Sequence, residues 1–266
     1  MRWMLIVAVG LVAVEPAWGQ LKIVDVFAAY GPRGPERKSL DTVPGDRVFF
    51  GFGVEGAQTD AEGKIDCTLE LELRDAAGMV LLKQQQPIRE TLALGGGSFP
   101  ASSNFQFSPE SPPGDFTFKT TVVDKLARRS ASFERTITVK KSEFAITNLV
   151  FFHDKDGKLP CSGTAVLGDQ LHLRFLAVGF DRTKPQLKHV MLVQTLDKNG
   201  RELLPKPMRA EVSTNDANVI ATAPGIVFNG SLAINRIGEF QIRLTVIDDV
   251  SERKTELTVP IKVVPR

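Results

Sequence analysis

The stretch Gly114-Asp115-Phe116-Thr117-Phe118-Lys119-Thr120-Thr121-Val122-Val123-Asp124 returns later in the chain as Gly238-Glu239-Phe240-Gln241-Ile242-Arg243-Leu244-Thr245-Val246-Ile247-Asp248. In both copies a glycine and an acidic residue precede a run with apolar side chains at every second position, and the run ends on aspartate. Alternation with a period of two predicts a half-buried β-strand. The spacing of the copies suits a whole small domain rather than a solenoid repeat. We therefore predict two tandem copies of one β-domain.

The similarity extends outward from this strand. Residues 21–27 match residues 144–150 as a first strand, and Gly45-Asp46 precedes a second strand as Gly168-Asp169 does. In the third strand, Cys67 of the first copy corresponds to His189 of the second. Each Gly-Asp pair predicts a turn that begins the second strand of its copy.

The sequence has short strands, turns every eight to twelve residues and no convincing amphipathic helix. This pattern predicts antiparallel β-sandwiches. The predicted organisation is a signal peptide at 1–19, one immunoglobulin-like sandwich at 20–141 and a second at 142–266. The copies diverge after their third strands. There, residues 84–87, 95–97, 205–207 and 214–218 are rich in Pro, Gly or polar side chains and predict loops that bound short edge strands.

The repeated Gly-(Asp/Glu)-Phe, followed by alternating apolar residues and a closing Val-x-Asp, resembles the penultimate strand of bacterial immunoglobulin-like and fibronectin-like sandwiches. These families often carry tyrosine where this chain has Phe116 and Phe240, so the tyrosine-corner hydrogen bond cannot form here. The Cys…Trp…Cys pattern of antibody domains is also missing from the sequence. The resemblance implies a fold and leaves the function open, because such sandwiches host many unrelated roles.

The first nineteen residues have the pattern of an export signal. Arg2 precedes the apolar run 4–14, and Ala17-Trp18-Gly19 offers small residues for cleavage before Gln20. The run is too short to cross a bilayer as a helix, which needs about twenty residues. An uncleaved helix is the alternative. The expected location is therefore periplasmic, cell-surface or extracellular, without a membrane span in the mature chain.

The composition argues against several partners. The net charge of +2 is close to balance and does not change when Arg2 and Glu15 leave with the signal, so no nucleic-acid partner is expected. Both tryptophans also leave with the signal, so Tyr30 is the one polar aromatic side chain beside 17 phenylalanines. Sugar-binding platforms rely on exposed Trp and Tyr, so carbohydrate binding is a minor alternative.

Catalytic and metal motifs are weak. His153, His172 and His189 fall outside any known catalytic pattern, no nucleophile elbow or phosphate loop is present in the sequence, and we expect no enzyme activity and no cofactor. Asp154 and Asp156, in the string His-Asp-Lys-Asp-Gly-Lys, resemble part of a calcium loop but lack its distal glutamate. A plain turn is the preferred interpretation, and calcium stays an alternative.

Asp124 and Asp248 are the polar positions most alike in the two copies. We interpret them as structural residues that accept backbone N–H groups in the hairpin that follows, although a ligand or ion at this end of each sandwich is possible on sequence alone. Cys67 and Cys161 lie at unrelated positions of the repeat, one in each copy, so a bridge within a sandwich is excluded. A bridge between the sandwiches would need their Cα atoms within about 7 Å.

These observations favour an exported, non-catalytic binding, adhesion or spacer protein. The expected partner is another exported or cell-surface protein, and exposed edge strands could receive a strand from it. The alternatives are a periplasmic chaperone-like protein, since pilus chaperones are also two-sandwich exported proteins, and a carbohydrate-binding module.

Overall fold

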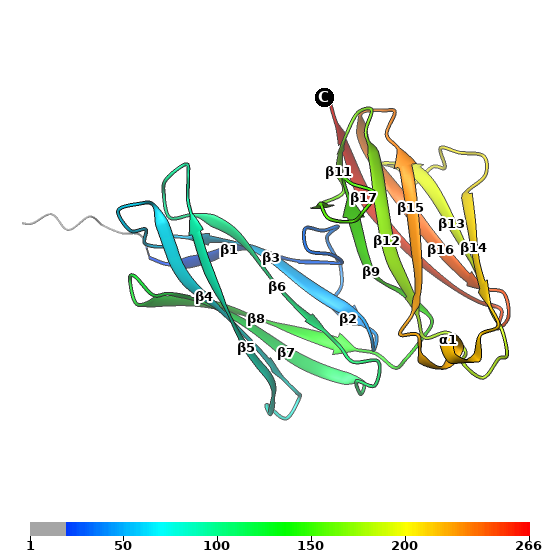
Figure 1. Cartoon of the computed structure of the whole chain (residues 1–266), viewed down its shortest axis with the longest axis horizontal. Coiled ribbons are helices and arrows are strands. Elements are labelled where there is room, and N and C mark those ends of the chain that lie inside the picture. The colour runs from blue at the N-terminus through cyan, green and yellow to red at the C-terminus, as the bar shows by residue number, and fades with distance from the viewer. Residues whose placement is uncertain (1–19) are drawn as a thin grey trace, which may run out of the picture.

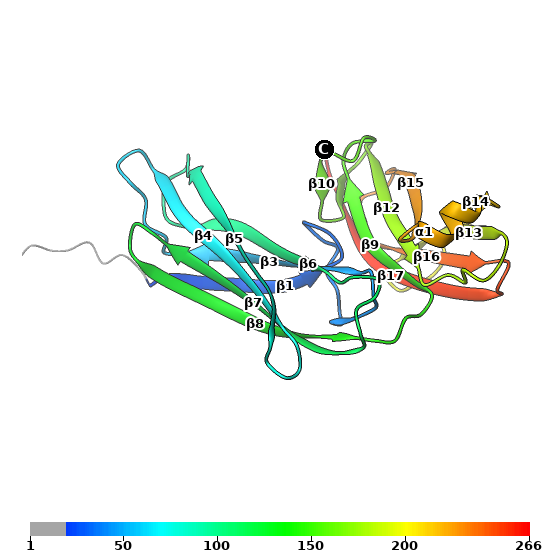
Figure 2. The same cartoon turned by 60° about the horizontal axis from the view of Figure 1, so that its bottom comes forward.

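The computed structural model describes residues 20–266, and the predicted signal peptide at 1–19 lies outside them. The described chain is all-β apart from one short helix. Its buried apolar side chains form two separate cores, one from residues between 21 and 139 and one from residues between 144 and 263. Figures 1 and 2 show the two bodies that surround these cores, which we call the N-terminal sandwich and the C-terminal sandwich.

The N-terminal sandwich contains eight strands in two facing sheets. The strands are β1 (Lys22–Ala29), β2 (Asp41–Thr42), β3 (Arg47–Glu55), β4 (Lys64–Arg74), β5 (Val80–Thr91), β6 (Phe99–Gln106), β7 (Gly114–Asp124) and β8 (Arg129–Val139). One sheet has the order β1-β3-β6 and the other β2-β8-β7-β4-β5. All pairs are antiparallel except β2 with β8.

The C-terminal sandwich repeats this order. Its elements are β9 (Ala145–Phe152), β10 (Pro160–Cys161), β11 (Thr164–Val166), β12 (Gln170–Val178), β13 (Leu187–Asp197), β14 (Met208–Thr214), α1 (Ala217–Thr222), β15 (Ile226–Ala233), β16 (Gly238–Asp248) and β17 (Arg253–Val264). The sheets are β10-β9-β12-β15 and β11-β17-β16-β13-β14, and β11 runs parallel to β17 as β2 does to β8. The predicted immunoglobulin-like sandwich architecture is confirmed.

The repeated stretch forms the equivalent strands β7 and β16, each inside a five-stranded sheet. Its alternate side chains point into the core as predicted: Phe118 and Ile242 are fully buried in their respective cores. Phe118 stacks on Phe50 of the opposite sheet with ring centroids 5.2 Å apart. Burying a side chain of this size stabilises the fold by about 1.5–3 kcal/mol, so these strands tie the two sheets of each sandwich together.

Unusual backbone conformations recur at equivalent places. Asp25 in β1 and Asn148 in β9 have φ of 51° and 53°, each where the pairing register with the neighbouring strand shifts. Arg128 and Glu252, just before β8 and β17, have φ of 53° and 55°. Positive φ is uncommon for any residue other than glycine, although Asp and Asn tolerate it best. The two sandwiches therefore share backbone details that the side-chain pattern does not reveal.

Two predicted loops are ordered elements instead. Residues 84–87 belong to β5, a continuous strand of 12 residues in which Pro87 is accommodated because β5 is an edge strand. Residues 214–218 lead into the helix α1, although no helix was expected. Asp216 caps it by accepting hydrogen bonds from Asn218 N and Val219 N.

The sandwiches meet through loops of the first and strand β9 of the second. The Asn148 side chain donates a hydrogen bond of 3.5 Å to the Gly45 carbonyl, and a Cβ at Gly31 would come within 2.9 Å of the Leu149 carbonyl. In Figure 1 the β1–β2 connection reaches the C-terminal sandwich beside β9. These contacts supplement the short covalent link between β8 and β9.

Candidate functional site

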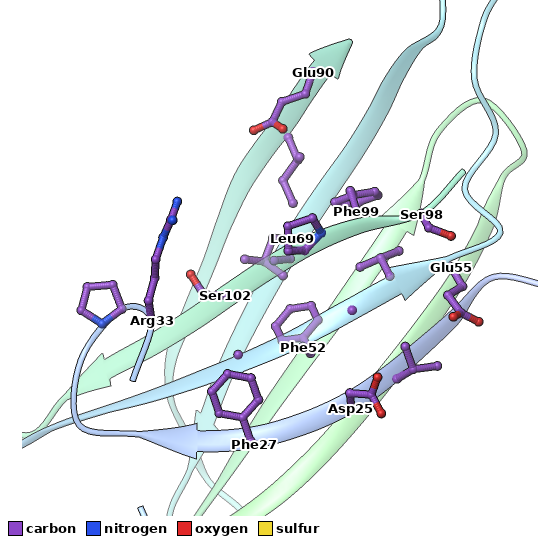
Figure 3. A pocket seen from close by; sticks show the side chains of 18 of the residues that line it. Asp25, Phe27, Arg33, Phe52, Glu55, Leu69, Glu90, Ser98, Phe99 and Ser102 are labelled. Carbon is purple, nitrogen blue, oxygen red and sulfur yellow. The ribbon is translucent and has the colours of Figure 1, made fainter. Parts of the chain in front are cut away.

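The sheets of the N-terminal sandwich differ in width, and this difference opens one side of it. A three-stranded sheet ending at β6 faces a five-stranded sheet ending at β5, and neither strand has a neighbour on its outer edge within residues 20–266. A cavity of about 890 Å³ lies along this side and continues over the outer face of β3 and β1. We call it the β5/β6 groove; Figure 3 shows Glu90 of β5 on one side of it and Phe99 and Ser102 of β6 on the other.

The floor of the groove is apolar. Leu69 and Phe99 line it with most of their surface buried, and Ile88 and Ala101 line it with part of their surface exposed. Ile88 and Ala101 pack against the core cluster from the two edge strands, where no further strand covers them. Pockets of 300–1,000 Å³ with apolar walls are typical of ligand sites, and this groove has both properties.

Glycines shape the outer face of the sheet beside the groove. Gly51 and Gly53 of β3 point away from the core, and a Cβ at Gly51 would collide with the ring of Phe27. The Phe27 ring therefore lies directly over β3, as Figure 3 shows. This packing is possible because the bulge between Val24 and Phe27 shifts β1 along β3. The Phe27 ring and Val24 thus add apolar surface to the lining of the groove.

Carboxylates outnumber cations around the groove. Asp25, Glu55 and Glu90 line it, with Arg33 as the single basic side chain among the lining residues. Within residues 20–266, none of these four side chains forms an ion pair within 4.0 Å. The groove is therefore apolar with a net negative rim, which favours an apolar ligand that carries positive charge.

The same side of the C-terminal sandwich is filled at one end by α1. Ile220 of α1 is 4% exposed and belongs to the core cluster. The Arg182 guanidinium donates to the carbonyls of Ile220 at 2.6 Å and Ala221 at 3.1 Å, which holds the end of the helix in place. The helix thus covers one end of the side that the N-terminal sandwich leaves open, while a cavity of about 440 Å³ stays at the other end beside Met208 and Leu232.

On the C-terminal sandwich, a cavity on the outer face of the sheet β10-β9-β12-β15 is lined by basic side chains and by no acidic ones. Arg174 of β12 donates to Asn229 at 2.9 Å and lies over the Phe152 ring, in a shallow cavity of about 420 Å³ that Lys155 and His172 also line. His172 shares a hydrogen bond with Ser231. At the position equivalent to Arg174, the N-terminal sandwich has Gly51, which has no side chain. The two sandwiches therefore share a backbone arrangement but expose different side chains on this face.

Asp124 and Asp248 occupy equivalent hairpins. Asp124 accepts hydrogen bonds from the backbone N–H groups of Gln58, Leu126 and Ala127 at 2.8–3.0 Å, and its side chain is fully buried. The Arg129 guanidinium lies 3.7 Å away and donates to the Gly56 carbonyl. Through these contacts the carboxylate holds the β7–β8 hairpin against the connection between β3 and β4 of the same sandwich.

Asp248 repeats the arrangement with small changes. It accepts from Val250 and Ser251, and Arg253 lies 3.5 Å away while donating to the Gly179 carbonyl. Burial opposes ionisation of Asp248, but the hydrogen bonds from Ser251 and Val250 and the nearby His189 lower its pKa below the ordinary value. Sequence reasoning did not single out these arginines, although Arg129 and Arg253 follow their aspartates at the same spacing along the chain.

Cys67 and His189 are the paired partners of these aspartates in the next strand. Burial, with a smaller contribution from Asp124, raises the pKa of the Cys67 thiol to about 11. His189 is fully buried between Phe144 and Phe180, and neither ring nitrogen has a hydrogen-bond partner among the described residues. Burial lowers the pKa of His189, and the Asp248 carboxylate, 3.9 Å away, partly opposes this effect.

The remaining sequence candidates lie apart. Asp154 accepts from the backbone of Lys158 and Leu159, and Asp156 pairs with the Lys158 side chain at 3.3 Å. Residues 20–266 contain no cluster of three or more His, Cys, Asp and Glu side chains with the arrangement of a metal site. Cys67 and Cys161 are both free thiols and both buried. Across the same residues no helix has the length and apolarity that a membrane crossing needs.

No family model matches the sequence, and no curated protein matches it. Among solved structures, the C-terminal domain of the Streptococcus pyogenes antigen I/II-family protein AspA is 12% identical with a TM-score of 0.29, over 92% of this chain and 100% of that one. The C-terminal domain of the Streptococcus agalactiae polypeptide BspA is 14% identical with a TM-score of 0.28, over 91% and 99%. Red sea bream transglutaminase is 12% identical with a TM-score of 0.29, and this chain spans 31% of its length. Likenesses this low carry no argument about function.

The β5/β6 groove is the functional candidate that sequence reasoning missed. The groove exists because β5 is a long strand, whereas the composition of residues 84–87 led us to predict a loop there. One signal was present in the sequence: Gly51 and Gly53 alternate within a strand that is otherwise rich in phenylalanine. Glycine inside a strand often marks close approach of another group, and here that group is the Phe27 ring.

Proposed function

We propose that this chain is an exported, non-catalytic binding protein whose ligand surface is the β5/β6 groove. The observation that carries the proposal is the open side of the N-terminal sandwich, where Ile88 and Ala101 leave inner-face apolar surface uncovered. Uncovered apolar surface with a polar rim is typical of protein-binding sites. Export rests on the sequence of residues 1–19, and a surface or periplasmic partner follows from it.

A protein partner agrees better with the groove than a sugar does. The aromatic side chains that line it, Phe27, Phe52 and Phe99, have no polar group to hydrogen-bond a hydroxyl. Its position between two free strand edges instead suits a stretch of polypeptide. An adhesion or spacer role would use the same surface to attach the chain to its partner.

The proposal is tested by capture with matched variants. Residues 20–266 are immobilised as wild type, Ile88→Lys and Glu110→Lys, and each is exposed to the exported protein fraction of the source cells. Ile88 lines the groove, whereas Glu110 is an exposed loop residue outside it. We expect one partner to be retained by wild type and Glu110→Lys and lost by Ile88→Lys. Retention by all three baits would contradict the groove as the binding surface.

A further inference from the structure

The free edge of β6 has hydrogen-bonding groups whose direction can be deduced from its pairing. Phe107 N donates to Asp46 O, and Ala57 N donates to Gly97 O, so residues 97 and 107 point their backbone groups toward β3. In antiparallel pairing this direction alternates along the strand, and β6 pairs with β3 without a register shift. The even-numbered residues Ser102, Asn104 and Gln106 therefore point their N–H and C=O groups away from β3. Ser102 lines the groove, and Asn104 and Gln106 continue the same free edge beyond it.

Prolines limit where these edges can pair. Pro100 belongs to the outward-pointing set of β6, so its place on the free edge offers a carbonyl and no N–H. In β5, Leu92 N donates to Gly63 O, which by the same alternation turns Pro87 outward. Prolines on edge strands are a common protection against uncontrolled strand pairing. The stretch from Ser102 to Gln106 is the part of β6 that this protection does not cover.

The unfilled position beside β6 has the dimensions of a strand. The sheet β1-β3-β6 is two strands narrower than the sheet it faces, so β5 has no strand opposite its inner face. A strand added about 4.8 Å from β6 would lie over Ile88 and Gln86 of β5, which line the groove. Its side chains would alternate between this apolar floor and the solvent side.

Charge indicates the composition of the added strand. Glu90 extends over the groove from β5, and Asp25 and Glu55 add to the negative potential of the same cavity. None of the three has a cationic partner within residues 20–266, as described above. A segment that alternates apolar and basic side chains would cover the floor and neutralise this rim.

We infer that the β5/β6 groove binds an extended polypeptide segment of another protein, with alternating apolar and basic residues, which pairs with the free edge of β6 from Ser102 to Gln106. This inference rests on the proposed function and adds the kind of ligand and its mode of binding. The groups that hold the segment are the outward N–H and C=O groups of β6, the apolar floor and Glu90.

The probe is a synthetic octapeptide of alternating valine and lysine, acetylated and amidated at its ends and labelled for fluorescence anisotropy. Two control peptides are used: one carries glutamate in place of lysine, and the other has N-methyl groups on alternate backbone nitrogens, which block strand pairing. We expect the first peptide to bind and each control to bind at least tenfold more weakly. Equal binding of the N-methylated peptide would overturn the inference.

Matched variants locate the contact. Asn104→Pro removes an outward N–H, while Asn104→Ala keeps the N–H and removes only the exposed side chain. We expect at least tenfold weaker binding for Asn104→Pro, less than a twofold change for Asn104→Ala, and at least threefold weaker binding for Glu90→Lys. Hydrogen exchange at the amides of Ser102, Asn104 and Gln106 should slow at least tenfold when the peptide binds, with Phe105 unchanged.

Other outcomes separate this inference from the proposed function. Unprotected amides, or wild-type binding by Asn104→Pro, would rule out strand addition. So would sedimentation of the chain as a dimer with these amides already protected, because a second copy would then occupy the edge. Capture of the natural partner that is lost in Ile88→Lys and kept in Asn104→Pro would retain the groove as the binding surface and reject the strand mode. Absence of peptide binding together with capture insensitive to both variants would reject both.

Discussion

The two sandwiches share strand order, edge positions and hairpin aspartates, yet they treat one side differently. The N-terminal sandwich leaves its β5/β6 side open, and the C-terminal sandwich inserts Ile220 of α1 into the corresponding side. The difference lies in the connection between the two edge strands. Residues 92–98 contain three glycines in a row, whereas residues 215–225 contain a capped helix. The connecting segment therefore determines whether this end of the side is covered; the other end of the C-terminal side keeps a cavity of about 440 Å³ beside Met208 and Leu232.

The glycines explain the difference physically. Each glycine costs a helix about 1 kcal/mol relative to alanine, so Gly95-Gly96-Gly97 strongly disfavours a covering helix. Gly97 in addition lies so close to the backbone of Ala57 that a Cβ would collide with its carbonyl. The end of the segment at Gly97 is thus held beside Ala57, just after β3, by this close approach and by the hydrogen bond from Ala57 N to Gly97 O.

Removing a hairpin aspartate should have the largest effect and should show whether the sandwiches unfold separately. Asp124→Ala leaves the backbone N–H groups of Gln58, Leu126 and Ala127 without their acceptor and removes a buried carboxylate beside Arg129, and we expect it to cost about 3 kcal/mol of stability. Urea unfolding followed by hydrogen-exchange mass spectrometry should show earlier exposure of the N-terminal sandwich only, and Asp248→Ala should show the converse. Asp75→Ala, at a surface turn where Asp75 accepts from Ala77 and Met79, is the control and should cost about 1 kcal/mol or less. Simultaneous loss of both sandwiches would mean that they unfold as one unit.

Truncating Ile220 should make the C-terminal sandwich resemble the N-terminal one. Ile220→Ala removes a buried side chain whose loss costs about 2–4 kcal/mol in cores, and the cost should lie at the lower end because α1 can detach locally. Hydrogen exchange in residues 215–225 should accelerate more than in β16. The exposed Val219→Ala on the same helix is the matched control and should change stability little. Equal acceleration throughout the sandwich would show that α1 belongs to the cooperative core.

Acid should destabilise the C-terminal sandwich first. Burial holds the pKa of His189 in the folded chain below its ordinary value of 6.5. As the pH falls below about 6.5, this histidine is therefore protonated more readily in the unfolded chain than in the folded chain. Stability is therefore full above this pH and decreases below it, by at most about 1.4 kcal/mol per pH unit. His189→Cys, which installs the residue found at the equivalent Cys67, should remove this slope between about pH 6.5 and 5. Urea midpoints measured across this range check it, and parallel slopes in both proteins would contradict it.

The smallest expected effect concerns the free edge itself. Asn104→Pro should change the stability of the N-terminal sandwich by no more than about 0.5 kcal/mol, because the N–H it removes points away from β3. Ser103→Pro, one residue earlier, should be far more costly since its N–H faces β3 and its hydroxyl bonds Thr120 at 3.0 Å. Thermal melts of the pair measure the contrast. Similar losses for both variants would show that the deduced alternation along β6 is wrong.

Sequence reasoning reached the fold because the deciding strands are strongly periodic. The alternation from Phe116 to Val122, and its repeat from Phe240 to Val246, depends only on neighbouring residues and a core on one face. It also placed Cys67 and His189 at equivalent points, which the pairing of each with an aspartate bears out. Signals of this kind are local and remain readable without coordinates.

The groove was not readable in this way, because it depends on long-range pairing. Residues 84–87 gain strand structure only through β4, since Gln84 pairs with Leu71 and Pro87 with Thr68. The helix α1 likewise needs the core that receives Ile220 and the arginine that caps it from residue 182. Tertiary contacts overrode local propensity at both places. The open side results from the different numbers of strands in the two sheets, which no single segment of the sequence determines.

The left-handed residues Asp25 and Asn148 have a consequence for tracing the ancestry of this architecture. Their backbone tolerates Asp, Asn or Gly and disfavours β-branched residues, so this position should change slowly even where the surrounding charges reverse. Distant relatives could therefore be searched for with a simple pattern: Asp, Asn or Gly as the fourth residue of the first strand in each of two successive domains. Such a pair of positions records a duplication more durably than overall residue identity does.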